Sequence, residues 1–212
     1  MQGSLVLEEE RMSRKKRLKQ IMKEEAEAIG KAADRIDYEV MSRILELLCS
    51  VRNSGKKVIL AGCGTAGQAA KRIAHTLSVV EIPAFFLSPA DSIHGGMGAM
   101  QEGDILVLLS KSGNTQEILN YLPAAAKKGL TVIGVTENEA SKLGQAADIV
   151  LKIKIDREPD HWGIISSAST LASISAFDAL AFTAMEETGY TKEEFYLIHT
   201  GGGVGAILRK EL

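Results

Sequence analysis

The residues with the clearest chemistry form the sequence Ser-Lys-Ser-Gly-Asn-Thr, which begins at Ser110 and is called here the serine turn. The apolar run at residues 105–109 before it is typical of a strand buried on both faces. Apolar residues at helical spacing follow it up to Pro123. A strand-to-helix turn of this kind offers an anion its backbone N–H groups and the hydroxyls of Ser110, Ser112 and Thr115. The turn predicts a phosphate site, although a capped helix would use the same residue types without a ligand.

A second turn, Gly62-Cys63-Gly64-Thr65-Ala66-Gly67, also separates a predicted strand from a predicted helix. Its glycine spacing matches the dinucleotide fingerprint, which also requires an acidic residue at the end of the second strand. That strand ends at Leu87-Ser88, and the next acid, Asp91, falls in the following loop. Tight packing of the strand against the helix explains the glycines without NAD. Two hydroxyl-bearing turns, with Thr65 in this one, favour a small phosphorylated ligand.

Alternating strands and helices must position both turns. Strands are predicted at residues 57–61, 84–87, 105–109, 131–135 and 149–153, and a long alanine-rich helix at 169–189. This order predicts an α/β fold, a doubly wound five-stranded parallel sheet with right-handed crossovers. Ligands of such sheets bind beyond the carboxyl ends of the strands, where both turns lie.

Two further helices are predicted in residues 8–53, which contain no proline. We therefore expect an N-terminal helical arm over residues 1–53 and an α/β domain that binds the phosphorylated ligand over residues 54–212. The arm would pack on the domain or on a second subunit.

Composition and charge exclude several classes of partner. The net charge of −2 offers no general attraction for nucleic acid or an anionic membrane, and the basic residues 14–17 are flanked by acids, as on a solvated helix. The two cysteines favour a reducing compartment. We expect no signal peptide, no apolar run of membrane-spanning length and no zinc site, and hence a cytoplasmic protein.

From Gly55 onward the chain resembles the sugar isomerase (SIS) domain family, and within it the arabinose-5-phosphate isomerase group. The motifs that carry the resemblance are Gly62-Cys63-Gly64, Ser88-Pro89-Ala90 with His94-Gly95, Ser110-Lys111-Ser112-Gly113 with Glu117-Ile118, Ala146-Ala147-Asp148, Ser169-Thr170, Phe177-Asp178-Ala179-Leu180-Ala181 and Ile198-His199-Thr200-Gly201-Gly202. The paired CBS modules that often follow in this group are not among these 212 residues.

The resemblance implies aldose–ketose isomerisation of a sugar phosphate through an enediolate, without a metal or redox cofactor, in a homodimer or homotetramer with shared active sites. It implies that the phosphosugar is bound by Gly64, Thr65, Ser110, Ser112, Thr115, Ser169 and Thr170. His199, reaching the site across a subunit interface, and Glu117 are the implied proton-transfer groups, together with His94 or Glu139.

Among the positions that depart from the pattern of the group, three bear most directly on catalysis. Thr65 stands where a lysine is typical, and Asn114 and Ala140 replace two glutamates, although Glu139 is only one position away. Two alternatives therefore stay open. One is a phosphosugar sensor without catalysis, and the other is an SIS enzyme that acts on an amino-sugar or hexulose phosphate, which Thr65 favours.

Overall fold

A five-stranded parallel sheet forms the centre of the computed structural model, which describes residues 2–212, with side chains from residue 11 onward. The strand order is β2-β1-β3-β4-β5, and every neighbouring pair is parallel. This confirms the predicted fold class, and each strand begins and ends within one residue of its predicted bounds. The strands are β1 (Val58–Gly62), β2 (Ala84–Phe86), β3 (Ile105–Leu109), β4 (Thr131–Thr136) and β5 (Ile149–Lys152).

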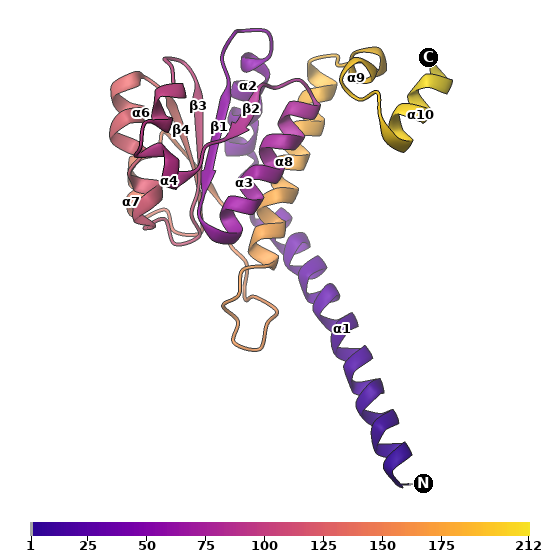
Figure 1. The fold of residues 1–212 in the computed structure, drawn as a ribbon. Coiled ribbons are helices and arrows are strands. Elements are labelled where there is room, and N and C mark those ends of the chain that lie inside the picture. Colours follow the sequence, from indigo (N-terminus) through magenta and orange to yellow (C-terminus); the bar gives the residue numbers. More distant parts are fainter. Residues whose placement is uncertain (1) are drawn as a thin grey trace.

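Helices cover both faces of the sheet, as Figure 1 shows. One face packs on α1 (Gln2–Arg35), α2 (Tyr38–Val51), α3 (Gly64–Val79) and α8 (Ala168–Glu187). The other packs on α4 (Pro89–Ser92), α5 (Gln116–Leu119), α6 (Leu122–Lys128) and α7 (Lys142–Ala146), with the short 3₁₀ helix η1 (Gly96–Ala99) nearby.

Side chains of β1 alternate between two separate apolar cores. Val58 and Leu60 belong to the core under α3 and α8, whereas Ile59 and Ala61 belong to the core under α6 and α7. All four are fully buried. Successive side chains of a strand point to opposite faces, so a strand covered on both faces must be apolar throughout. This is why the strands could be predicted from uninterrupted apolar runs.

The predicted N-terminal arm forms α1 and α2. The N-terminal part of α1 extends away from the sheet, and its C-terminal part contacts α8 (Figure 1). The carboxylate of Asp37 caps α2 by accepting from the N–H groups of Glu39 and Val40. Ile44 and Leu48 of α2 are fully buried in the same core as β1. The boundary between an arm and a domain at residue 53 stays a prediction.

Helix α8 differs from one expectation. By length and composition it could cross a membrane, with a mean hydropathy of 1.3, and it is the one such helix in residues 2–212. The expectation that no apolar segment approaches that length is therefore wrong for α8, because its many alanines raise the hydropathy without long apolar side chains. Phe177, Leu180 and Ala184 of α8 are buried in the core shared with α3. A core helix meets the same criterion.

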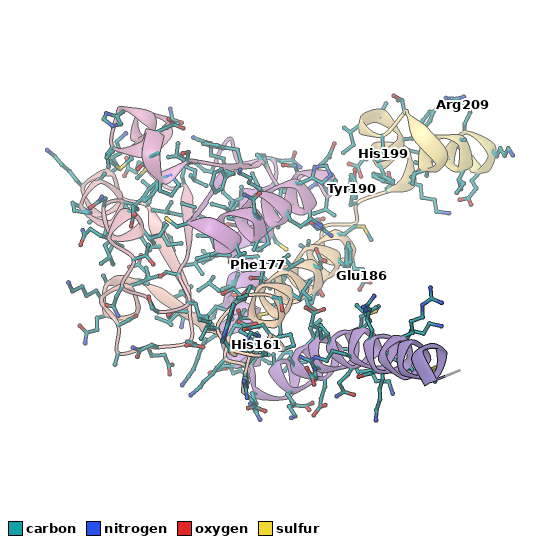
Figure 2. The ribbon with its side chains drawn as sticks, turned by 60° about the horizontal axis from the view of Figure 1, so that its bottom comes forward. His161, Phe177, Glu186, Tyr190, His199 and Arg209 are labelled. Atoms are coloured by element: carbon teal, nitrogen blue, oxygen red, sulfur yellow. The ribbon has the colours of Figure 1, made fainter. Side chains whose placement is uncertain are left out.

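The C-terminal residues form two helices, α9 (Lys192–Ile198) and α10 (Gly202–Glu211), which pack on each other and project from the body (Figure 2). Arg52 holds the base of α9: its guanidinium donates to Glu194 and to the carbonyl of Thr188, and it lies over the ring of Tyr190. The apolar side chains of Leu197 and Ile207 are 77% and 57% exposed.

Candidate phosphosugar site

The serine turn and the start of α3 meet at the carboxyl edge of the sheet. Gly62 and Leu109, the last residues of β1 and β3, are direct partners in the parallel register, so the two turns that follow them are neighbours. Between them lies a cavity of about 320 Å³, called here the edge cavity. Its lining is Cys63, Thr65, Ala66, Leu109, Ser110, Lys111, Ser112, Thr115, Glu137 and Ser166.

A smaller pocket of about 50 Å³ adjoins the edge cavity and shares Thr65 and Ser110 with it. The first turns of α8 add Ser169, Thr170 and Ser173 to its lining. Six of the seven predicted ligand-binding residues thus line one of two adjoining spaces. The seventh, Gly64, is the first residue of α3 and precedes Thr65.

Hydrogen bonds within the serine turn hold its hydroxyls in place. The Ser110 and Thr115 hydroxyl oxygens are 2.9 Å apart, and the N–H of Gly113 donates to Ser110 Oγ at 3.1 Å. The N–H of Asn114 donates to Ser112 Oγ at 3.2 Å. Gly113 has a φ of +68°, and a Cβ there would lie 1.9 Å from Ser141 Oγ. The turn therefore needs glycine both for its backbone conformation and for the close approach of α7.

Several backbone donors of the edge remain available to an anion. Within residues 2–212, the N–H groups of Ser112, Thr115 and Gln116 make no hydrogen bond to the protein. Helix α3 has no side-chain cap and no acidic residue in its first turn. Because α3 has 16 residues, its N-terminus carries a partial positive charge that favours an anion.

The helical pattern after the serine turn forms two short helices, α5 and α6, with a break at Asn120 and Tyr121. Pro123 explains the break, because its ring excludes the carbonyl of residue 119 and it has no N–H to donate. With only four residues, α5 contributes little dipole. The attraction for an anion comes from the turn's own N–H groups and from α3.

Two glycines of the first turn serve packing. A Cβ at Gly62 would lie 2.7 Å from the carbonyl of Ala66, and one at Gly67 would lie 2.7 Å from the carbonyl oxygen of Gly62. Close contact of β1 with α3 thus accounts for Gly62 and Gly67, whereas Gly64, the middle glycine of the fingerprint spacing, has a φ of +55° and no atom near its Cβ position.

Glu158 is a residue of this region that sequence analysis missed. Its carboxylate is buried beside the adjoining pocket and accepts from Lys111 Nζ at 2.7 Å, from Ser167 N at 3.0 Å, from Ser169 N at 3.3 Å and from the Ser169 hydroxyl. Burial opposes its ionisation, but the hydrogen bonds from Lys111, Ser169 and Ser167 outweigh it, and the pKa of Glu158 lies below its usual value. Glu158 therefore caps α8 as an anion.

Sequence reasoning also missed Lys111 and Glu137 as lining residues. No local pattern marks Glu158, since its partner Lys111 lies 47 residues earlier in the chain. Lys111 lies within the serine turn itself, and a positively charged residue in a turn expected to bind phosphate could have been predicted to line the site. Glu137 directly follows β4, at the same sheet edge as the serine turn.

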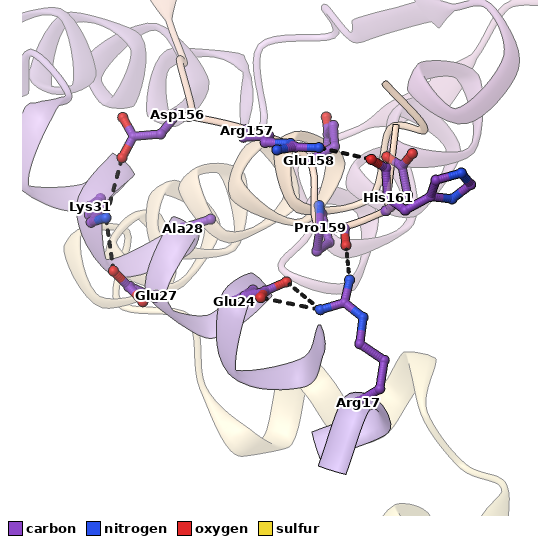
Figure 3. A pocket seen from close by; sticks show the side chains of 11 residues that line it. Arg17, Glu24, Glu27, Ala28, Lys31, Asp156, Arg157, Glu158, Pro159 and His161 are labelled. Atoms are coloured by element: carbon purple, nitrogen blue, oxygen red, sulfur yellow. Dashed lines mark hydrogen bonds and ion pairs between the residues drawn. The ribbon is translucent and has the colours of Figure 1, made fainter. Parts of the chain in front are cut away.

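A third space, called here the α1 cavity, lies on the other side of Glu158 and measures about 340 Å³. Figure 3 shows that an ion pair and a hydrogen bond cross it. Arg17 of α1 contacts Glu24 and donates to the carbonyl of Pro159, while Lys31 pairs with Asp156 at 3.3 Å. These contacts fix the segment that carries Glu158 against α1.

The four predicted proton-transfer residues do not line the edge cavity or the adjoining pocket. Glu117 is exposed in α5, close enough to Cys63 that its charge adds to burial in raising the pKa of that thiol. His94 is exposed between α4 and η1, and Glu139 is exposed and paired with Lys152. His199 ends α9, its ring 5.0 Å from that of Phe195, on the projecting pair of helices (Figure 2).

A search for a metal site gave no candidate. Within the described residues, no three His, Cys, Asp or Glu side chains are grouped so that they could hold a metal ion.

Known proteins share both the sequence and the fold. The model of the SIS domain matches residues 52–183. Arabinose 5-phosphate isomerase KdsD of Pseudomonas aeruginosa is 35% identical over 84% of this chain and 55% of its own length. Arabinose 5-phosphate isomerase GutQ of Escherichia coli K12 is 34% identical over 72% of this chain and 47% of its own length. The chain thus spans about half the length of the curated relatives it matches.

Two solved structures are similar over nearly their whole chains. A candidate sugar-phosphate isomerase of Listeria monocytogenes has a TM-score of 0.85 and 41% identity, over 88% of this chain and 96% of its own. The protein c3406 of E. coli CFT073, solved in complex with arabinose 5-phosphate, has a TM-score of 0.81 and 29% identity, over 86% and 95%. With the family match over residues 52–183, these likenesses show that the chain belongs to the SIS domain family.

Proposed function

We propose that this chain is an aldose–ketose isomerase of sugar phosphates, similar to the arabinose-5-phosphate isomerases. The observation that carries the proposal is the edge cavity, where the hydroxyls and free N–H groups of the serine turn face the uncapped N-terminus of α3. The names of the KdsD and GutQ relatives and the arabinose 5-phosphate complex of a similar structure support the same substrate class.

In this proposal the serine turn and Thr65 bind the phosphate. The sugar extends toward Ser166 and the hydroxyls of Ser169 and Thr170, which line the adjoining pocket. Hydroxyl groups suit this part of the site because they both donate to and accept from sugar hydroxyls.

The reaction requires a base that moves a proton between C1 and C2 through an enediolate. Glu137 is placed for this role within one chain, since it lines both spaces and its carboxylate makes no hydrogen bond within the described residues. Glu117 lies close by, near Cys63. Glu139 and His94 stay candidates from the sequence.

His199 can take part only from a second copy, because α9 and α10 project from the body of their own chain (Figure 2). The exposed apolar side chains of Leu197 and Ile207 on these helices support contact between copies. The proposal therefore includes a homodimer or homotetramer with shared sites, and a cytoplasmic location in keeping with two free thiols.

The test uses thermal unfolding and turnover of the purified chain with arabinose 5-phosphate, its unphosphorylated parent, and amino-sugar and hexulose phosphates. We expect arabinose 5-phosphate, but not arabinose, to raise the unfolding midpoint and to be converted to the corresponding 2-ketose phosphate. Ser112→Ala should weaken binding by about 1–3 kcal/mol. Binding without turnover would indicate a sensor, turnover of another sugar phosphate alone would change the substrate, and no stabilisation by any phosphosugar would refute the site.

The enediolate step has its own test. An aldose phosphate with deuterium at C2 should react more slowly and should lose label to the solvent, because the base abstracts that deuteron. Complete transfer of the label to C1 of the ketose would contradict proton transfer through a solvent-exchanging base.

A further inference from the structure

Among the described residues that line the edge cavity and the adjoining pocket, Lys111 is the one with a positive charge. The other charged lining residue is Glu137. A sugar phosphate brings a negative charge of nearly two, which the hydroxyls and N–H groups of the serine turn contact but do not neutralise. The charge balance of the site therefore depends on Lys111.

The ammonium group of Lys111 is fixed by an ion pair with Glu158. It donates to Glu158 at 2.7 Å, and the Glu158 side chain is fully buried whereas that of Lys111 is 37% exposed. An ammonium group has three N–H donors, and Glu158 takes one of them. Lys111 lines the edge cavity and its side chain is partly exposed, so two of its donors are left for a ligand.

The Glu158 charge does not cancel that of Lys111 at the cavity. The same carboxylate accepts the N–H groups of Ser167 and Ser169 at the start of α8, a helix of 20 residues. The N-terminus of a long helix carries a partial charge of roughly +0.5. The Glu158 carboxylate is thus shared between the full charge of Lys111 and the partial positive charge of α8, so Glu158 offsets only part of the Lys111 charge.

We propose that Lys111 is the residue that binds and neutralises the phosphate of the sugar, and that Glu158 is a positioning residue that holds Lys111 at the cavity wall. The inference rests on the proposed function, because it names the charged group of the same phosphosugar site. A flexible lysine side chain loses rotamer entropy when it binds a phosphate. Because the contact with Glu158 already restricts the rotamers of Lys111 in the ligand-free protein, less entropy is lost when the ligand binds. The pair selects phosphorylated sugars over their neutral parents.

The experiment is titration calorimetry of arabinose 5-phosphate and of inorganic phosphate with the parent chain, Lys111→Gln and Lys111→Arg. The glutamine amide still donates to Glu158 but carries no charge. We expect Lys111→Gln to raise both dissociation constants about 10- to 100-fold and Lys111→Arg to raise them less than about 5-fold. Lys56→Gln is the matched control, because Lys56 precedes β1 at the opposite edge of the sheet, where it donates to the carbonyl of Glu102.

The positioning role is tested by repeating Lys111→Gln in a chain that carries Glu158→Gln. If Glu158 positions Lys111, the effect of Lys111→Gln on the dissociation constant falls to less than about 3-fold in that background. An equal effect in both backgrounds would show that Glu158 acts only on the fold.

The outcomes separate this inference from the proposed function. A parent chain that binds no phosphosugar refutes both. A parent chain that binds arabinose 5-phosphate, with Lys111→Gln binding it within twofold, refutes the role of Lys111 and leaves the proposed function intact. Thermal unfolding of each variant shows that it is folded before its titration is interpreted.

Discussion

Replacement of Glu158 by alanine should destabilise the fold even without ligand. The carboxylate accepts from Lys111, from the N–H groups of Ser167 and Ser169, and from the Ser169 hydroxyl. Alanine leaves these donors without their acceptor in a site where Glu158 itself is only 1% exposed. The perturbation thus removes a helix cap and a buried ion pair together.

The magnitude follows from these contacts. Loss of a helix cap costs about 1 kcal/mol. Loss of the charged partner costs less than the 3–5 kcal/mol typical of a fully buried pair, since Lys111 is 37% exposed and water can solvate it. We expect about 3 kcal/mol in total once the lost packing is included. For a chain of this size, that lowers the unfolding midpoint by about 6–12 °C.

The assay is thermal unfolding at pH 7 and one fixed protein concentration, with Glu27→Ala as the control. Glu27 pairs with Lys31 at 2.8 Å, nearly the separation of the Glu158 pair, but both side chains are largely exposed. The control should keep its midpoint within about 2 °C of the parent. If Glu158→Ala also changes the midpoint by less than about 2 °C, the reasoning about this buried carboxylate is wrong.

Three further perturbations test other parts of the structure. Gly113→Ala should unfold well below the parent, because its φ of +68° and a Cβ 1.9 Å from Ser141 Oγ require the turn to move; an unchanged melting curve would contradict this geometry. The pKa of Glu158 is below its usual 4.5, so the ionised carboxylate stabilises the fold above that pH, and this stabilisation is lost as the pH falls through the lower pKa of the folded protein. In an acid titration, the free energy of unfolding should therefore fall less in Glu158→Gln than in the parent chain. Identical profiles of the two chains would refute this reasoning. His199→Ala should abolish turnover of arabinose 5-phosphate while its calorimetric affinity stays within a few-fold, and full activity would remove His199 from the mechanism.

Local patterns were sufficient for the sheet and for the position of the serine turn. The five apolar runs predict strands because a parallel strand is buried on both faces. The serine turn and Thr65 could be assigned to one edge because parallel strands place their carboxyl ends together. The order β2-β1-β3-β4-β5 then makes the turns after β1 and β3 direct neighbours.

One cause explains why sequence analysis missed Glu158 and Glu137 and why Glu139 does not line the cavity. Glu158, in an irregular segment, meets Lys111 only after the chain has crossed the sheet, and no spacing in the sequence records that contact. Glu137 lines the cavity and Glu139 does not, because the backbone turns between them and Glu139 pairs with Lys152. A loop sequence predicts that acids are near an edge, but not which of them faces the cavity.

The sequence by itself determined the parallel sheet and the two turns at its carboxyl edge, because periodicity and turn chemistry are local properties. The tertiary structure decided which charged side chains surround those turns. It buried Glu158 between α8 and Lys111 and placed His199 on helices that project from the body. These are long-range arrangements, set by how helices pack on a sheet, and a one-dimensional pattern does not contain them.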